Sequence, residues 1–268
     1  MGLFDLSGDI AVLIGAGGVL GSAIANGMAE AGADIVILDL RPEAAEAAAA
    51  KITADTGRKA LGLGCNATDR DSIQAAHDRI LAEMGTPTIL LNACGGNNPR
   101  ITVGGDKRFE DISPEDFRFG VDLNLAGGAF LPCQVFGPTM AAAGKGSIVN
   151  IASVSAHIPL SKVVVYSAAK AAVISLTQFL AREWAESGVR VNSITPGFFP
   201  AEQNMKLMFN DDGSPTERGQ SILTHTPMRR FGKPEELVGA AVFLASQAAS
   251  FITGTDIRID GGFLSQTI

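Results

Sequence analysis

Short apolar runs recur along the chain and alternate with longer segments that mix apolar and polar residues. Runs of this length, bounded by glycine or polar residues, are typical of strands buried on both faces of a parallel sheet. The longer segments between them predict helices. The pattern as a whole predicts strands at residues 10–14, 34–38, 60–64, 88–92, 147–151, 189–194 and 256–259.

The order of these elements indicates the class of fold. Strand and helix patterns alternate over residues 1–268, and no linker interrupts them. Such alternation predicts a single α/β domain, in which a mostly parallel sheet of seven strands has helices on both faces. One helix is expected at residues 41–56, where Pro42 begins an alanine-rich segment of high helix propensity.

Composition supports a large core and restricts the classes of partner. Hydrophobic residues make up 46% of the 268 residues and charged residues 18%, enough to cover both faces of a parallel sheet. The formal net charge of −7 gives nucleic acid and anionic membranes no electrostatic attraction for this protein. We therefore expect a small-molecule ligand, with neither nucleic acid nor a membrane as partner.

Cysteine usage and the first residues bear on the compartment. Cys65, Cys94 and Cys133 are odd in number and lack metal-ligand spacing, so neither a disulfide framework nor a metal site is expected. The opening MGLFDLSGD is acidic and short of apolar residues, unlike a signal peptide, and polar residues interrupt every longer apolar stretch. These features predict a cytoplasmic protein.

A glycine-rich turn lies between the first two predicted strands, in DIAVLIGAGGVLGSAIANGMAEAGADIVILDLR at residues 9–41. Strand, glycine turn, helix and strand in this order form a dinucleotide-binding unit, because glycine lets the backbone approach a pyrophosphate at a helix N-terminus. The fold expected is therefore of the doubly wound Rossmann type. The cofactor contacts expected in this turn are Gly15, Gly17, Gly18, Val19, Leu20 and Gly21.

Asp39 ends the second predicted strand and bears on the choice of cofactor. A carboxylate there can accept hydrogen bonds from both ribose hydroxyls and would repel a 2′-phosphate. NAD(H) is therefore favoured. Arg41 follows two residues later and offers a cation for that phosphate, so NADP(H) is kept as an alternative.

Tyr166 and Lys170 stand four positions apart in SKVVVYSAAKAAVISLTQFLAREW and form a candidate catalytic pair. On a helix both side chains project from the same face. A neighbouring cation stabilises a phenolate, so Lys170 is expected to lower the pKa of Tyr166 and make it an acid/base. Tyr166 is also the one tyrosine in the chain. Ser153 follows the predicted strand in GSIVNIASVS, thirteen residues before Tyr166.

These motifs together make the chain resemble the short-chain dehydrogenase/reductase family over nearly its whole length. The resemblance implies Ser153, Tyr166 and Lys170 as the catalytic core, with Asn124 in DLNLAG holding a water as a fourth member. It also implies hydride transfer between a nicotinamide and a substrate carbon. Tyr166 would transfer the proton while Ser153 hydrogen-bonds the reacting oxygen and Lys170 contacts the nicotinamide ribose.

Further motifs extend the resemblance along the cofactor. NACG at 92–95 resembles a strand-end motif of the family, PGFF at 196–199 the segment that passes the nicotinamide, and DGGF at 260–263 the C-terminal strand end. These matches imply cofactor contacts from Asn66, Ala67, Asn92, Ala93, Gly95, Tyr166, Lys170, Pro196, Gly197 and Phe199.

Three positions depart from the family pattern. The middle glycine of the first turn, Gly18, stands one place early. Asn66 replaces an aspartate that holds the adenine amino group, although its side-chain oxygen can still accept that bond. Ala201 replaces a threonine and so removes a hydroxyl expected near the carboxamide.

The substrate segments resemble the sugar-acid branch that interconverts D-fructuronate and D-mannonate. They are GGNNPR at 95–100, EQN at 202–204 and HTPMRRFGKPEEL at 225–237. The resemblance implies that the polar, turn-rich residues 198–230 form a lid over substrate. A polyhydroxy acid needs several polar contacts and a cation. The candidate contacts are Asn97, Asn98, Arg100, Ser153, His157, Gln203, Asn204 and Lys206, with Arg100 or Lys206 as the partner of the carboxylate.

Two other functions stay open. A gluconate 5-dehydrogenase or a deoxyhexulosonate reductase would use the same catalytic residues under a different lid. A regulatory protein that binds NAD without turnover would keep the fold alone, although intact Ser153, Tyr166 and Lys170 argue against it. The resemblance further implies a homotetramer, assembled through two long helices and the C-terminal strand.

Overall fold

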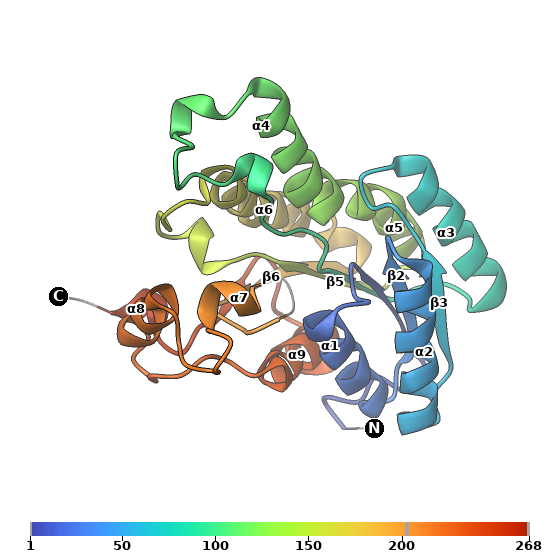
Figure 1. Ribbon diagram of the computed structural model, residues 1–268. Helices are drawn as coiled ribbons and strands as arrows, with labels where there is room; N and C mark the ends of the chain where they lie inside the picture. Colours follow the sequence, from blue (N-terminus) through green and yellow to red (C-terminus); the bar gives the residue numbers. More distant parts are fainter. Residues whose placement is uncertain (1, 202–203, 267–268) are drawn as a thin grey trace.

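The apolar runs form one parallel sheet, with its strands in the order β3-β2-β1-β4-β5-β6-β7 (Figure 1). The computed structural model describes residues 2–201 and 204–266. All seven predicted strands are present, and their observed ends differ from the predicted ones by at most two residues. They are β1 (Ile10–Ile14), β2 (Asp34–Asp39), β3 (Ala60–Gly64), β4 (Ile89–Asn92), β5 (Gly146–Ile151), β6 (Val189–Pro196) and β7 (Asp256–Ile259).

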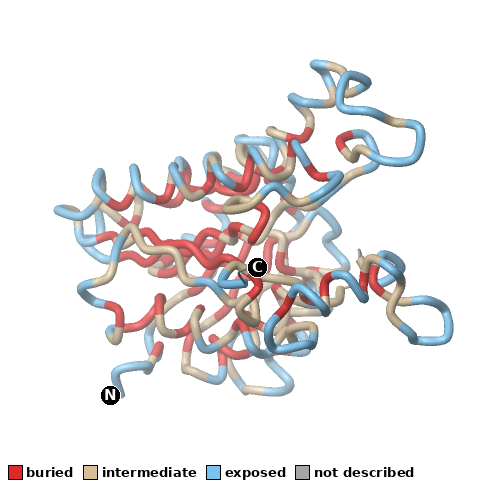
Figure 2. The backbone as a smooth tube through the Cα atoms, turned by 90° about the vertical axis from the view of Figure 1, so that its left-hand side faces the viewer, coloured by how far each residue is buried: buried red, intermediate tan, exposed pale blue. Residues whose placement is uncertain are grey.

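In the five central strands, β2, β1, β4, β5 and β6, residues on opposite faces enter two separate hydrophobic cores. In β1, Ala11 and Leu13 belong to one core, whereas Val12 and Ile14 belong to the other. This division follows from the two-residue period of a strand, and it explains why a strand covered on both faces is apolar throughout. Figure 2 shows the buried residues (red) concentrated along the strands and the inward turns of the helices.

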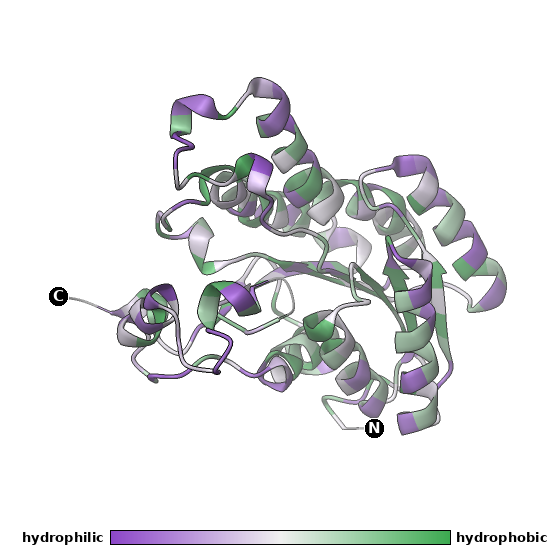
Figure 3. Cartoon of the chain, viewed as in Figure 1, coloured by the Kyte–Doolittle hydropathy of each residue, from purple (hydrophilic) through white to green (hydrophobic). Residues whose placement is uncertain are grey.

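Three helices cover each face of the sheet. One core is completed by α1 (Val19–Glu30), α2 (Pro42–Thr56) and α9 (Val238–Ala245), and the other by α3 (Arg70–Glu83), α5 (Leu131–Ala142) and α6 (Val164–Glu183). Hydrophilic residues lie on the outer turns of α2 and α3 (Figure 3). The predicted doubly wound α/β fold is confirmed.

The predicted helix at residues 41–56 forms as α2. Pro42 occupies its first position, where the missing amide proton is not needed. Gly57 follows the helix at a φ of 71°, a left-handed conformation that favours glycine. Local sequence is therefore sufficient to set both ends of this helix.

The remaining helical segments are shorter and lie between these elements. They are α4 (Pro114–Val121), the π-helix η3 (Asp122–Phe130), α7 (Met205–Met208), α8 (Glu217–His225) and the short 3₁₀ turns η1 (Pro99–Ile101), η2 (Phe109–Asp111), η4 (Val154–Ala156), η5 (Ala185–Ser187), η6 (Pro234–Leu237), η7 (Gln247–Ala249) and η8 (Phe263–Ser265). Both α7 and α8 fall within the predicted lid, and Figure 1 shows them (orange) on the side opposite α2 and α3.

Helix α6 is long and apolar enough, by length and composition alone, to cross a membrane. The sequence prediction did not single it out, because Tyr166 and Lys170 interrupt its apolar residues. In the fold, α6 packs against β5, β6 and the π-helix η3, and Val165, Val173 and Ala181 are buried. These contacts place α6 as a core helix of the domain.

Candidate active site

Three of the four predicted catalytic side chains, those of Ser153, Tyr166 and Lys170, meet at one cavity of about 310 Å³. Ser153 lies just beyond the carboxyl end of β5, where its Oγ accepts hydrogen bonds from the amide (3.2 Å) and hydroxyl (3.1 Å) of Ser155. Tyr166 stands in the first turn of α6, and Lys170 follows one turn later. All three line the cavity, as the parallel sheet brings the end of β5 to the start of α6.

Lys170 is held firmly beneath the cavity. Its Nζ donates a hydrogen bond to the carbonyl oxygen of Ile151 at 2.7 Å and lies 5.8 Å from the centre of the Tyr166 ring. Only 3% of the residue is exposed, and this burial lowers the pKa of Lys170 to about 8. The ammonium therefore keeps its charge at neutral pH and loses it in mildly alkaline solution.

The pKa of Tyr166 moves opposite to the direction that the sequence predicted. Some of the side chain remains accessible, but its hydroxyl lies deep enough that burial raises the pKa of Tyr166 above its usual value. A hydrogen bond with Ser153 opposes this effect and is smaller. The expected lowering by Lys170 is therefore wrong for this structure, because desolvation dominates. Tyr166 is protonated at neutral pH, which is the form that donates a proton.

Asn124 is buried in the π-helix and uses its side chain as a brace. Its Oδ1 accepts from the amide of Gly96 at 2.8 Å, and its Nδ2 donates to the carbonyl oxygens of Gly96 (3.1 Å) and Gly120 (3.0 Å). These bonds hold the loop after β4 against the helix. Asn124 does not line the cavity, so its role in holding a water stays a prediction.

A second cavity, of about 470 Å³, adjoins the first along the carboxyl edge of the sheet. The two share Ala93, Gly95 and Ala201, so together they form one extended groove. The predicted contacts Gly15, Gly18, Val19, Asp39, Asn66 and Ala67 line this second part. The groove has the shape and the donors that a dinucleotide requires.

Gly15 shows why glycine is needed in the turn. Its φ is 74°, and a Cβ there would lie 2.6 Å from the Cα of Cys94. Any other residue would push the first turn away from the loop after β4.

Three other predicted contacts shape the groove from behind and do not line it. Gly17 donates its amide to Asp39 at 3.0 Å, and a Cβ at Gly21 would lie 2.4 Å from the Cα of Ala16. Asn92 is buried, and its Nδ2 donates to Asn150 Oδ1 at 2.8 Å. These three residues therefore contact other parts of the protein that form the groove, and they do not line the groove themselves.

Asp39 offers its carboxylate at the edge of the groove. It accepts from the amides of Gly17 and Arg41 (3.1 Å), and its side chain is 12% exposed. The Arg41 guanidinium lies 3.6 Å away and is more exposed. The carboxylate is thus fixed in position by the backbone, as a binder of ribose hydroxyls must be.

The side-chain oxygen of Asn66, which the sequence predicted to accept a hydrogen bond from adenine, is already hydrogen-bonded within the protein. Its Oδ1 already accepts from the amide (3.1 Å) and the hydroxyl (2.8 Å) of Thr68. Two bonds use both lone pairs of that oxygen, so the side chain has only its NH₂ group to offer a ligand. The predicted acceptor role is corrected for this reason.

The segment predicted to pass the nicotinamide lies beside the predicted catalytic residues. Leu20, Pro196, Gly197 and Phe199 line the first cavity together with Ser153, Tyr166 and Lys170. A Cβ at Gly197 would lie 2.7 Å from the Cα of Asp260 in the DGGF motif, so two sequence motifs meet here.

Of the predicted substrate contacts, Asn97 and Asn204 line the cavity, whereas Arg100 and His157 do not. Asn97 lines the cavity and donates to Thr102 Oγ1 at 2.7 Å, which leaves its oxygen available. Asn204 also lines it, but its amide bridges the lid backbone, accepting from Ala201 N (2.8 Å) and donating to Phe199 O (2.9 Å). Gln203 lies outside the described residues.

Arg100 does not reach the cavity. Its Nε donates to Asp116 Oδ1 at 2.7 Å, and its guanidinium lies 4.5 Å from the centre of the Phe119 ring. The predicted pairing with a substrate carboxylate is therefore wrong in this structure, because Asp116 and Phe119 already hold the side chain.

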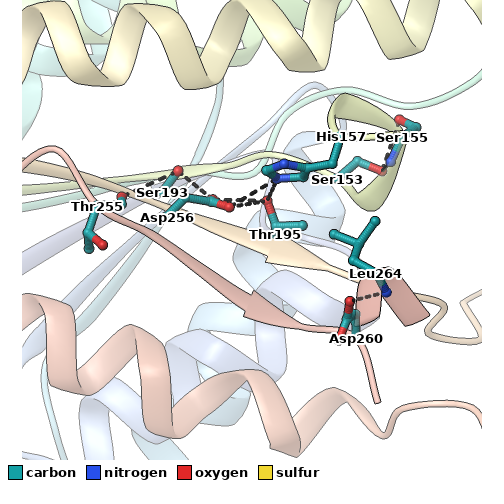
Figure 4. A network of polar contacts seen from close by, with 9 residues as sticks. All are labelled: Ser153, Ser155, His157, Ser193, Thr195, Thr255, Asp256, Asp260 and Leu264. Atoms are coloured by element: carbon teal, nitrogen blue, oxygen red, sulfur yellow. Dashed lines mark hydrogen bonds and ion pairs between the residues drawn. The ribbon is translucent and has the colours of Figure 1, made fainter. Parts of the chain in front are cut away.

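The His157 ring points toward Thr195 and Asp256 (Figure 4). Its Nε2 lies 3.1 Å from Asp256 Oδ2 and 3.3 Å from Thr195 Oγ1, at the pair of strands β6 and β7. It does not line the cavity. The predicted substrate contact is corrected to a brace between the Ser153 loop and the edge of the sheet.

Several residues that line the cavity were missed by the sequence predictions. They include Leu160, Val163, Leu207, Met208 and Arg218. Only Arg218 carried a usable signal. Thr216 is an N-cap residue in the stretch SPTER, so its position predicts a helix start with Arg218 in the first turn.

Comparisons with known proteins agree with this geometry. A family model described as enoyl-(acyl carrier protein) reductase matches residues 15–264. D-threitol dehydrogenase from Mycolicibacterium smegmatis is 40% identical over 260 residues, which cover 97% of this chain and 94% of the relative.

Two solved structures are also similar. One is a protein from Haemophilus influenza, provisionally named a D-mannonate oxidoreductase and solved with bound NAD. It has a TM-score of 0.91 and 38% identity over 98% of this chain and 97% of that chain. A gluconate 5-dehydrogenase from Burkholderia cenocepacia, in complex with NADP and tartrate, has a TM-score of 0.88 and 32% identity over 99% and 98%. The chain belongs to the short-chain dehydrogenase/reductase family, NAD(P)-dependent oxidoreductases that act on CH–OH groups.

Proposed function

We propose that this protein interconverts a keto sugar acid and its hydroxy acid, of the D-fructuronate and D-mannonate type. The observation that carries the proposal is the meeting of Ser153, Tyr166 and Lys170 at one cavity beside a groove that presents Asp39. The likeness to the Haemophilus protein supports the substrate class.

The proposed mechanism assigns one task to each side chain. The nicotinamide, when bound, supplies or accepts the hydride. In reduction, Ser153 donates a hydrogen bond to the substrate carbonyl oxygen and stabilises the charge that develops there. Tyr166, protonated because of its raised pKa, gives its proton to the same oxygen. The Lys170 ammonium stabilises the phenolate left on Tyr166, and Ile151 O holds that ammonium in place.

NAD(H) is the proposed cofactor. The fixed carboxylate of Asp39 would lie against the ribose hydroxyls and would repel a 2′-phosphate. Of the two similar structures, one holds NAD and the other NADP, so the family accommodates both. In this chain Arg41 pairs with Asp39, which favours its role as a partner of that carboxylate.

Two alternatives have separate support. The Burkholderia structure favours another ketose-acid reductase, such as a gluconate 5-dehydrogenase or a deoxyhexulosonate reductase. The identity with D-threitol dehydrogenase favours a neutral polyol. Each would use the same catalytic residues, so the lid decides between them.

We also propose a cytoplasmic homotetramer. Phe130, at the end of the π-helix, and Phe179, on α6, are exposed large apolar side chains. Exposed aromatic residues on the long helices fit an interface between copies of the chain.

The proposal is tested by following oxidation of NADH and NADPH against D-fructuronate, 5-ketogluconate, a deoxyhexulosonate and a neutral ketose. Fast reduction of D-fructuronate with NADH is expected. Tyr166→Phe should lower turnover about 10³-fold, because the proton donor is lost, while NADH affinity stays within about twofold. Activity confined to the neutral ketose would contradict the substrate class, and equal efficiency with NADPH would contradict the role given to Asp39.

A further inference from the structure

One cation of the lid faces the catalytic cavity without a partner among the described residues. Arg218, in the first turn of α8, lines the cavity and is half-buried, and it makes no hydrogen bond or ion pair within residues 2–201 and 204–266. The other lid cations differ. Arg230 is paired with Glu236 at 2.6 Å, and Lys206 is exposed on α7 and does not line the cavity.

The backbone that carries Arg218 is fixed on both sides. Thr216 donates its amide to Met208 O at 2.9 Å and its hydroxyl to Leu207 O at 2.7 Å. A Cβ at Gly219 would lie 2.2 Å from Met208 O, so α8 begins in close contact with α7. Arg218 therefore projects from a defined position on the lid, and only its side chain is left to find a partner.

Among the described residues, the rest of the cavity lining offers an anion no cation that lacks a hydrogen-bond partner. Lys170 is the other cation that lines it, and Lys170 is already bonded to Ile151 O. Among the described lining residues none is aspartate or glutamate, and most are apolar. A half-buried guanidinium in such surroundings attracts a carboxylate, because its charge is partly shielded from water and two parallel hydrogen bonds can form.

We propose that Arg218 binds the carboxylate of the substrate and so selects an acid over a neutral polyol. The inference rests on the proposed function and deepens it, since it names the residue that binds the carboxylate of the substrate. It also replaces the predicted partners Arg100, which is bound to Asp116, and Lys206, which lies outside the cavity. The protein carries a net charge of −7, so a local cation is what an anionic substrate needs to be held here.

The test measures binding without turnover. With NADH bound, D-mannonate cannot be oxidised, so its dissociation constant can be measured by calorimetry and compared with that of the neutral alditol D-mannitol. Arg218→Gln should weaken D-mannonate binding about 50-fold and leave D-mannitol and NADH within about twofold. Arg218→Lys should retain part of the affinity, because lysine keeps the positive charge but cannot form the two parallel hydrogen bonds of a guanidinium.

Lys206→Gln is the matched control, since it removes one positive charge from the same lid at a position outside the cavity. It should change neither affinity. Unchanged D-mannonate binding in Arg218→Gln, or an equal loss for D-mannitol, would overturn the role of Arg218. If the wild-type protein instead reduces only neutral ketoses, the proposed function fails, and this result is distinct because it does not depend on any variant.

Discussion

The catalytic residues and the lid meet at the same cavity, yet they are held in different ways. Lys170 and Asn124 are buried, and they donate hydrogen bonds to the carbonyl oxygens of Ile151 at the end of β5 and of Gly96 in the loop after β4. In the lid, Leu207 is 55% exposed although it lines the cavity, and Arg218 has no partner among the described residues. The chemistry is thus positioned before substrate arrives, whereas selectivity is left to side chains that find their partner on binding.

The difference has an energetic side. Burial of the Lys170 ammonium costs folding free energy, as its lowered pKa records. Exposed apolar residues in the lid contribute little to the core, so a change there should affect ligands more than stability. Substitutions in the buried catalytic residues and in the lid can therefore test this difference.

The largest effect is expected from Lys170→Met. Turnover should fall about 100-fold, because the phenolate of Tyr166 loses the charge that stabilises it. The free energy of unfolding at pH 7 should nevertheless rise by about 1–2 kcal/mol. A shift from 10.5 to about 8 costs about 3 kcal/mol, and the loss of the bond to Ile151 O offsets part of that gain. Activity assays and urea unfolding provide the two measurements.

The sign of this stability gain depends on pH. Between pH 8 and 10.5 the unfolded chain binds a proton at Lys170 that the folded protein does not. Wild-type stability should therefore rise over that interval, and the advantage of Lys170→Met should disappear near pH 10.5. The exposed Lys51 provides the control, since Lys51→Met should show no such change. If Lys170→Met is less stable than the wild type at pH 7, the burial of the Lys170 ammonium does not cost the folding free energy that we infer.

A smaller effect is expected from Gly219→Ala in the lid. The new Cβ would lie 2.2 Å from Met208 O, so α8 must shift against α7. The KM for the keto acid should rise about tenfold, since a displaced lid misplaces its contacts. The KM for NADH and the melting temperature should stay almost unchanged. Gly239→Ala is the control, because nothing lies within 4 Å of its Cβ. A large drop in melting temperature would show that the lid is part of the core.

The smallest effect concerns pH. The pKa of Lys170 is lowered to about 8, so its charge is lost as pH rises through that value. Reduction should therefore slow about threefold between pH 7.5 and 8.5 in kcat/KM profiles. Lys170→Arg keeps its charge over this range and should lack the decline, even if its rate is lower. A decline that persists in Lys170→Arg would assign the titration to another group.

The sequence predicted that Ser153, Tyr166 and Lys170 lie together, and the structure brings all three to one cavity, because the signals that identify them are local. Tyr166 and Lys170 are one helical turn apart, and Ser153 follows a strand that its apolar run identifies. The direction of the Tyr166 pKa could not be predicted in this way. Spacing revealed the neighbouring cation but not the burial that outweighs it.

The substrate residues show the same limit. Arg100 and His157 carry the right chemistry, but Asp116 and Asp256 occupy them. The sequence did not indicate Arg218, although this cation of α8 lines the cavity. Nothing in the local sequence distinguishes an occupied polar side chain from an available one.

The sequence by itself determined the seven strands, the glycine turn and the placement of Tyr166 and Lys170 on one face of a helix, because hydrophobic period and helical spacing act between near neighbours. Only the tertiary structure decided which polar groups are free. His157 and Asp256, for example, are 99 residues apart in the chain and 3.1 Å apart in the fold. Hydrogen bonds and burial depend on such distant partners, and these are set when the sheet and its helices pack.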